Sequence, residues 1–291
     1  MTEKVLSIEG FSVDYLVDPV VHAVKDVSFE LRRGEVLGLA GESGCGKSTL
    51  AYGIVRLLKP PASITTGRAV FHDRDGRDVD WNELHAEDLR ANRWEKISMV
   101  FQGAMNSLNP VVSIRDQFED IFTTHRPKMG RRERRQRCGD LLERVGVDRG
   151  RLNAYPHELS GGMRQRVMIA MAMALEPHIM IMDEPTTALD VVVQREILRE
   201  IARLRDELGF AVIFITHDLP LLLEISDRIA VMRRGEIVEL ADALTLYTSP
   251  RHDYTKQLLA SFPSLTGDRG SFVRGAMDDR LLALDAVEGT A

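Results

Sequence analysis

The segment GESGCGKST, Gly41 to Thr49, constrains the fold of this chain more than any other. It follows a short apolar run, EVLGLAG, that predicts a buried strand, and it opens KSTLAYGIVRLLK, a predicted helix that we expect Pro60 and Pro61 to end. Glycines at this spacing between a strand and a helix let backbone N–H groups approach the phosphates of a nucleotide. We expect the amine of Lys47 to reach the β- and γ-phosphates and the hydroxyl of Ser48 to bind Mg²⁺. The alternative is a chance glycine turn.

Strand and helix patterns alternate along most of the chain and predict an α/β fold. The alternation in KVLSIEGFSVDYLV and AVKDVSFELRRGE indicates half-buried strands, and GRAVFHDRDGRDV predicts a hairpin turning at Asp75 and Gly76. The runs HIMIMDE and AVIFITHD are typical of buried parallel strands, and an amphipathic helix pattern lies between them. From about residue 109 to 166 the pattern is helical and charged, so we expect a helical insert within the α/β core.

Polar side chains follow three of the predicted buried strands. In IMIMDEP we expect Asp183 to hold Mg²⁺ and Glu184 to polarise a water for attack on the γ-phosphate, with two acids capping a sheet edge as the alternative. His217 follows the strand predicted to lie beside that of Asp183, and its imidazole is expected near the γ-phosphate rather than in a structural role. Gln102 ends a third strand, where it is a candidate sensor of the metal and the attacking water and equally a hinge.

A second glycine-containing helix start lies at LSGGMRQRV, Leu159 to Val167. Ser160, Gly161 and Gly162 precede the predicted helix, where free N–H groups and the positive end of the helix dipole favour anions. This segment lacks the lysine of the first loop, so one chain carries two unequal phosphate cradles.

Composition excludes several classes of protein. The net charge of −6 disfavours nucleic acid as the main partner, because binding to a phosphate backbone requires a basic surface. Cys45 and Cys138 are the only cysteines, too few for a disulfide framework, which indicates a reducing compartment. The most apolar run, residues 167–182, is interrupted by charged and proline residues, so we expect a cytoplasmic chain that meets the membrane only through a partner.

The phosphate loop, Gln102, LSGGMRQRV, IMIMDEP, TTALD and His217 occur in an order and spacing that resemble the ATP-binding cassette (ABC) ATPases over about residues 5–240. The resemblance implies an α/β P-loop core with a mixed central sheet and an antiparallel β subdomain. It places the core in residues 1–103 and 167–240, a helical subdomain in about 104–166, and a C-terminal extension in 241–291 whose end we expect to be disordered.

The resemblance also implies where the ligands bind. Two cassettes would pack head to tail, so that the second cradle holds the γ-phosphate of ATP bound to the partner. The implied ATP contacts are Tyr15 (by stacking on adenine, with a core position as the alternative), Gly41, Glu42, Ser43, Gly44, Cys45, Gly46, Lys47, Ser48, Thr49, Gln102, Ser160, Gly161, Gly162 and Asp190. The implied Mg²⁺ ligands are Ser48, Gln102 and Asp183, and the implied catalytic residues are Glu184, His217, Gln102 and Lys47.

A narrower resemblance links the chain to the ATP-hydrolysing subunits of dipeptide and oligopeptide importers, a group that includes nickel and oligosaccharide importers. It rests on SLNPVVSIRDQ, YPHELSGGMRQRVMIAMAMALEP and the tail LYTSPRHDYTKQLLASFPSL, in which Asp253 replaces the usual proline. The implied partners are a second cassette, as a heterodimer, two membrane permease subunits that dock at GAMNSLNP and the helical insert, and an extracellular solute-binding protein. The protein would then lie at the cytoplasmic face of a bacterial membrane.

Other interpretations stay open on the sequence alone. A soluble ABC ATPase acting on nucleic acid or ribosomes is the main alternative, and an inactive regulatory cassette is another, although Glu184 and His217 favour activity. The basic cluster Arg126–Arg137 is either a solvated helix face or a contact for anionic lipid or an acidic partner. With no cysteine after Cys138, we predict no iron–sulfur centre in the extension. The transported solute is not indicated.

Overall fold

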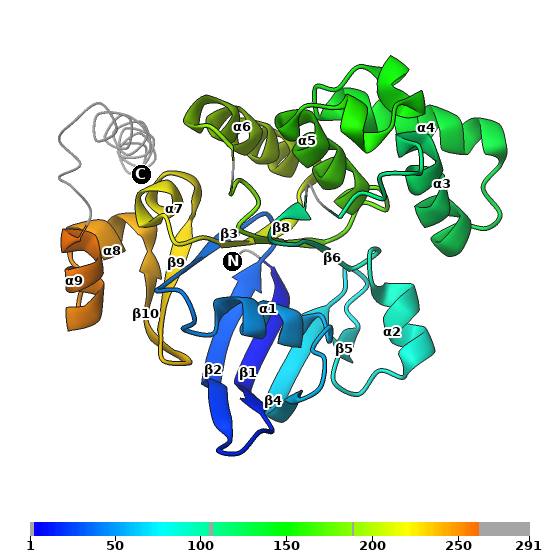
Figure 1. The fold of residues 1–291 in the computed structure, drawn as a ribbon. Coiled ribbons are helices and arrows are strands. Elements are labelled where there is room, and N and C mark those ends of the chain that lie inside the picture. Colours follow the sequence, from blue (N-terminus) through cyan, green and yellow to red (C-terminus); the bar gives the residue numbers. More distant parts are fainter. Residues whose placement is uncertain (1–2, 105–106, 188, 262–291) are drawn as a thin grey trace, which may run out of the picture.

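The structure, a computed structural model, describes residues 3–104, 107–187 and 189–261. Figure 1 shows a central sheet with helices on one face and a second, antiparallel sheet on the other. The described part is therefore an α/β protein, as the sequence pattern predicts.

The antiparallel sheet has the strand order β2-β1-β4-β5. Its strands are β1 (Lys4–Tyr15), β2 (Val21–Arg32), β4 (Ala62–His72) and β5 (Asp78–Asp80). The predicted hairpin is present, because β4 and β5 pair and the backbone N–H of Asp73 donates to the carbonyl of Arg77 across the turn (2.9 Å). Gly76 takes the left-handed conformation that this turn requires (φ 81°).

The central sheet has the order β10-β9-β3-β8-β7-β6. Neighbouring strands are parallel throughout except for the β9–β10 pair, which is antiparallel. The parallel strands therefore end at one edge of the sheet, the edge where α/β proteins bind ligands. The strands are β3 (Val36–Ala40), β6 (Ile97–Val100), β7 (Ile179–Asp183), β8 (Ala211–Ile215), β9 (Arg228–Arg233) and β10 (Glu236–Asp242).

Alternate side chains of the central strands enter two different cores. In β7, Met180 and Met182 pack among the helices, whereas Ile179 and Ile181 pack toward α1 and the antiparallel sheet. The same division holds in β8, where Phe214 faces the helices. Because both faces are buried, these strands are apolar at every position rather than at alternate ones.

The helices cover one face of the central sheet and continue into a peripheral group (Figure 1). They are α1 (Lys47–Ile54), α2 (Ala86–Asn92), α3 (Ile114–His125), α4 (Arg131–Arg144), α5 (Gly161–Ala172), α6 (Val191–Leu208), α7 (Leu219–Ile225), α8 (Ala243–Thr248) and α9 (Asp253–Ala260), with 3₁₀ turns at Arg149–Asn153 and Pro156–Glu158. Among these, α1 and α2 are exceptions: α1 packs on the opposite face, between the two sheets, and Leu89 of α2 joins the same core.

The end of α1 differs from the prediction. We expected the helix to continue to Pro60, but it ends at Ile54. Arg56 takes a left-handed backbone conformation (φ 53°), and its guanidinium donates to the carbonyls of Trp81 (2.9 Å) and Leu84 (2.6 Å). These long-range contacts, rather than the prolines, accompany the exit of the chain from the helix.

The start of the C-terminal extension is more regular than its pattern indicated. Helices α8 and α9 lie beside β9 and β10 (Figure 1). Asp253 is the first residue of α9, where proline is also favoured, and an acid there interacts well with the helix dipole. Residues 262–291, for which we expected disorder, lie outside the described residues.

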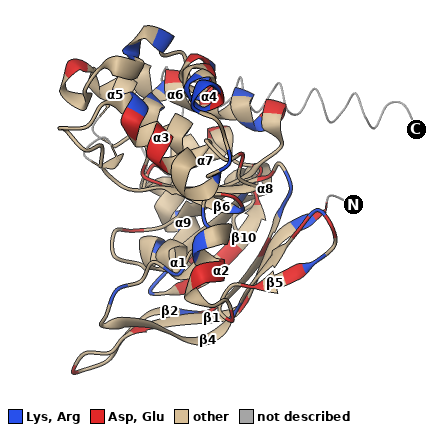
Figure 2. Cartoon of the chain, turned by 90° about the vertical axis from the view of Figure 1, so that its right-hand side faces the viewer, with Lys and Arg blue, Asp and Glu red and all other residues tan. Residues whose placement is uncertain are grey.

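The described residues contain no helix that is both long and apolar enough to cross a bilayer. The basic cluster lies on α4 and just before it, at the end of the molecule far from β4 (Figure 2). Three of its arginines are engaged within the protein: Arg126 pairs with Glu95, Arg137 with Glu176 (2.7 Å), and Arg134 donates to the hydroxyl of Thr123 (2.6 Å).

Candidate functional site

The phosphate loop connects the end of β3 to the start of α1 at the carboxyl edge of the central sheet. Its turn depends on two glycines. Gly41 (φ 146°) and Gly46 (φ 110°) have backbone conformations that L residues rarely adopt. A Cβ on either would lie 2.3 Å from a carbonyl oxygen, that of Met232 or Ala23. The loop can therefore be this tight only with glycine at both positions.

Lys47 lies inside the loop rather than outside it. Its side chain is buried, and its amine donates to the carbonyls of Gly41 (2.7 Å) and Glu42 (2.8 Å) and lies 3.6 Å from the sulfur of Cys45. Cys45 is itself buried. The loop thus holds a positive charge at its centre, where an anion would be attracted.

Asp183 ends β7 directly beside α1. The hydroxyl of Ser48 donates to Asp183 Oδ1 (3.2 Å), while Oδ2 is buried and has no hydrogen-bond partner among the described residues. Burial raises the pKa of this carboxyl, and the neighbouring Glu184 charge raises it further, against the opposing effects of Ser48 and Lys47. A buried carboxylate oxygen without a donor, next to a hydroxyl, is a donor set suited to Mg²⁺. The residues present therefore fit the predicted cation.

The carboxylate of Glu184 contacts three side chains, two of them from residues predicted at the site. Gln102 Nε2 donates to Glu184 Oε2 (3.1 Å), the Thr187 hydroxyl donates to the same oxygen (3.0 Å), and His217 Nδ1 lies 3.0 Å from Oε1. The left-handed backbone of Glu184 (φ 46°) accompanies the abrupt end of β7 after Asp183. The predicted adjacency of the strands that precede His217 and end at Asp183 is confirmed by the parallel β7–β8 pairing, and β6, which precedes Gln102, pairs with β7 on its other side.

The hydrogen bonds of Glu184 keep it ionised. Burial alone raises its pKa, but the hydrogen bonds from His217 and Thr187, with the charges of His217 and Lys47, bring the pKa below its ordinary value. A carboxylate that is charged at neutral pH is able to accept a proton from water.

The second cradle lies apart from this cluster. Ser160 is the N-cap of α5, its hydroxyl accepts from the N–H of Met163 (3.3 Å), and its side chain is exposed. Within residues 3–104, 107–187 and 189–261, no hydrogen bond joins Ser160, Gly161 or Gly162 to the phosphate loop. The structure therefore does not bring these two predicted sites together within one chain.

Asp190 caps the neighbouring helix. Its carboxylate accepts from the N–H groups of Val192 (3.1 Å) and Val193 (3.0 Å) at the start of α6. A Cβ on Gly162 would lie 2.8 Å from Val193, so the starts of α5 and α6 are in contact. Val191 and Val192 are exposed apolar side chains beside this cap.

Tyr15 is the last residue of β1, and its hydroxyl lies 3.3 Å from that of Thr49 on α1. The ring is partly exposed rather than part of the core, so the alternative of a core position is not what the structure has.

Three residues near the site were not predicted. Thr187 contacts Glu184, and its position in DEPTTALD, three residues after the acid, was a signal that could have identified it. Tyr52 stacks on Phe101 (ring centroids 5.9 Å apart), and the charge of Asp183 adds to the effect of burial in raising its pKa. Tyr254 of α9 contacts the loop at Glu42, which the local sequence pattern does not indicate.

Comparisons with known proteins agree with this geometry. The sequence profile of the ABC transporter family matches residues 24–187. The dipeptide transport ATP-binding protein DppD of Bacillus subtilis is 42% identical, over 90% of this chain and 78% of its own length. The peptidoglycan transport ATP-binding protein YejF of Agrobacterium fabrum is 46% identical over 90% of this chain, which spans about half (48%) of that relative.

A solved structure extends the comparison to the fold. The dimeric structure of the ATP-binding cassette MJ0796 in a post-hydrolysis state, bound to ADP and Pi, matches with a TM-score of 0.70 and 29% identity. The match covers 82% of this chain and 98% of that cassette. The profile match, the long alignments with transport ATP-binding proteins and the shared fold show that this chain belongs to the ABC transporter family, among its ATP-binding cassettes.

Proposed function

We propose that the chain is the ATP-hydrolysing subunit of an importer that takes up dipeptides or oligopeptides through partner membrane subunits. The main observation behind the proposal is that four side chains lie together at one edge of the central sheet, those of Lys47, Ser48, Asp183 and Glu184. The names of DppD and YejF support transport, but they differ in the solute. Uptake of an oligosaccharide or nickel is therefore the nearest alternative.

Each residue of the cluster has a role in this proposal. Lys47 and the loop N–H groups bind the β- and γ-phosphates, and Glu184 accepts the proton of the attacking water. His217, 3.0 Å from Glu184, orients that carboxylate, and Gln102 contacts its other oxygen. Ser48, Asp183 and Gln102 would hold Mg²⁺, which when bound neutralises charge on the transferred phosphoryl group.

The remaining ATP contacts depend on a second cassette. We propose that Ser160, Gly161 and Gly162 bind the γ-phosphate of ATP held by the partner, and that Asp190 lies at the same interface. Support comes from the exposure of Ser160, from the exposed Val191 and Val192 that directly follow Asp190, and from the dimeric form of the MJ0796 cassette. We favour a heterodimer of homologous cassettes, and we place Tyr15 against the adenine.

A permease docks, in this proposal, between the core and the helical insert. A groove of about 850 Å³ lies there, lined by residues of α2, α3, α5 and the end of β6 and including Trp94, Phe101, Leu108, Gln117, Ile121 and Met168.

We assign residues 1–103 and 167–240 to the ATP-binding core, about 104–166 to the helical insert and 241–291 to the extension. Helix α5 crosses the later boundary, since it begins at Gly161 and runs to Ala172. The protein would then lie at the cytoplasmic face of the membrane, with an extracellular solute-binding protein completing the importer.

The proposal is tested with the variant Glu184→Gln, which keeps the shape of the side chain but not its basicity. We expect hydrolysis of ATP to fall by about 10² to 10⁴. We also expect tagged variant plus ATP to recover a second cassette and two membrane-spanning subunits from detergent-solubilised host membranes. The exposed Glu83→Gln is the matched control and should hydrolyse ATP at the wild-type rate.

Two results would count against parts of the proposal. A wild-type hydrolysis rate for Glu184→Gln would remove Glu184 as the base. Recovery of ribosomes or DNA without any membrane subunit would leave the ATP site in place and overturn the transport function.

A further inference from the structure

The C-terminal helix α9 contacts the phosphate loop. The backbone N–H of Glu42, the second residue of the loop, donates to the hydroxyl of Tyr254 (3.3 Å). Tyr254 is only 4% exposed, although it follows the loop by about two hundred residues of sequence. The extension thus reaches the site that binds the phosphates in the function proposed above.

Tyr254 is held firmly in this position. The guanidinium of Arg233, on β9, lies over its ring at 4.7 Å. The carboxylate of Glu239, on β10, accepts from the N–H groups of Arg251 (2.8 Å) and His252 (3.0 Å), and His252 in turn caps α9 by accepting from the N–H of Tyr254 (3.1 Å). The hydroxyl is therefore presented to the loop by the edge of the central sheet.

The hydrogen bond acts on a peptide unit that also faces Lys47. The N–H of Glu42 and the carbonyl of Gly41 belong to one trans peptide and point in opposite directions. Tyr254 binds the N–H, while the carbonyl accepts from the amine of Lys47 (2.7 Å). Gly41 has no side chain to restrict rotation of this peptide, so its orientation depends on such external contacts.

We propose that Tyr254 is a positioning residue for Lys47: its hydroxyl fixes the 41–42 peptide, which holds the lysine amine at the centre of the phosphate loop. The inference rests on the proposed ATP-binding function of that loop. It makes the extension part of the nucleotide site, and it distinguishes the hydroxyl of Tyr254, which acts on the loop, from its ring, which packs against Arg233.

The test removes only the hydroxyl, with Tyr254→Phe. We expect the Kd for ATP·Mg²⁺, measured by displacement of a fluorescent ATP analogue, to rise about two- to tenfold, the effect of one hydrogen bond. We expect KM to rise in parallel, kcat at saturating ATP to change little, and the melting temperature to stay unchanged because the ring remains. Tyr247→Phe, in α8, is the matched control, since that hydroxyl makes no hydrogen bond within the described residues.

A second measurement does not depend on nucleotide. In the nucleotide-free protein, hydrogen exchange at the Glu42 amide should be faster in Tyr254→Phe than in the wild type or in Tyr247→Phe. Unchanged Kd, KM and Glu42 exchange in Tyr254→Phe would overturn the inference while leaving ATP binding intact. Failure of the wild-type protein to bind ATP would instead overturn the proposed function and the role of Lys47 that the inference assumes.

Discussion

At the scale of single residues, two adjacent carboxylates have opposite environments. Asp183 is 1% exposed with one oxygen unpartnered within the described chain, whereas Glu184 is hydrogen-bonded at both oxygens. The pKa of Asp183 is accordingly raised, first by burial, and that of Glu184 lies below its ordinary value. A bound cation would relieve the desolvated charge of Asp183, whereas Glu184 stays ionised at neutral pH and is free to act as a base.

Replacing Asp183 by Asn tests this separation. Because burial raises the pKa of Asp183, its charge destabilises the nucleotide-free protein at neutral pH, and its removal should raise the melting temperature. The same change should weaken binding of ATP·Mg²⁺ about tenfold or more. Thermal unfolding with ATP and Mg²⁺, and with ATP and EDTA as the control, measures both effects. An equal Mg²⁺-dependent stabilisation in the variant and the wild type would contradict the assignment of Asp183 to the metal.

At the scale of elements, local pattern predicted the strands well. The runs ending at Asp183 and His217, and the hairpin at Gly76, were predicted because their periods and turn residues agree with their final environment. The early end of α1 was not predicted, since it accompanies contacts of Arg56 with a segment about thirty residues away. The cluster around Glu184 could be predicted as neighbouring strand ends, but the contact of Tyr254 with the loop could not, because nothing local to α9 indicates it.

In the loop connecting β3 to α1, Gly44 and Gly46 allow the cost of a steric clash to be measured separately from the cost of a left-handed backbone. Gly46→Ala combines a positive φ with a Cβ 2.3 Å from the carbonyl of Ala23, whereas Gly44→Ala has a positive φ but open space. We expect the first change to reduce the free energy of unfolding by about 3 kcal/mol or more and the second by about 1 kcal/mol. Urea denaturation of both variants measures the difference. Equal losses would show that the close approach of the loop to Ala23 is not a constraint.

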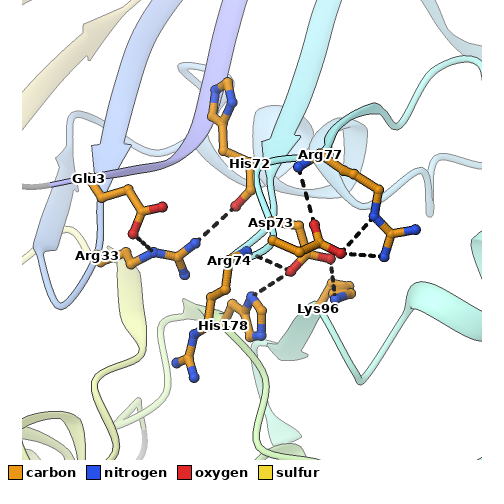
Figure 3. Close-up of polar contacts among 9 residues, drawn as sticks. Glu3, Arg33, His72, Asp73, Arg74, Arg77, Lys96 and His178 are labelled. Atoms are coloured by element: carbon orange, nitrogen blue, oxygen red, sulfur yellow. Dashed lines mark hydrogen bonds and ion pairs between the residues drawn. The ribbon is translucent and has the colours of Figure 1, made fainter.

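At the scale of the whole molecule, a half-buried polar cluster (Figure 3) joins the two sheets near the amino ends of the central strands, the edge opposite the phosphate loop. Asp73, in the turn between β4 and β5, accepts from the amine of Lys96, which directly precedes β6 (2.6 Å). His178, just before β7, donates its backbone N–H to the carbonyl of Lys96 (3.0 Å) and places its ring 4.0 Å from Asp73 and against Phe71. The antiparallel sheet is thus connected to the amino ends of two central strands.

This cluster predicts a pH dependence of stability. Burial, with the charges of Arg74 and Lys96, lowers the pKa of His178 to about 4, whereas an unfolded histidine has a pKa of about 6.5. The unfolded state therefore binds the proton first, so this contribution is complete above pH ~6.5 and is lost as the pH falls toward 4. Between pH 7 and pH 5 the loss is about 2 kcal/mol in the free energy of unfolding.

Replacing His178 by Gln, which stays neutral, should remove that part of the pH dependence. Urea denaturation at pH 7 and at pH 5 would show a smaller difference for His178→Gln than for the wild type, whereas the exposed His85→Gln should keep the wild-type difference. The compared quantity is the difference in the free energy of unfolding between pH 7 and pH 5 within each protein. Any loss of packing against Phe71 in the variant affects both values equally and therefore cancels. If His178→Gln lost as much stability on acidification as the wild type, the link between the two sheets would not depend on a neutral histidine, and the pair of Asp73 with Lys96 would account for it alone.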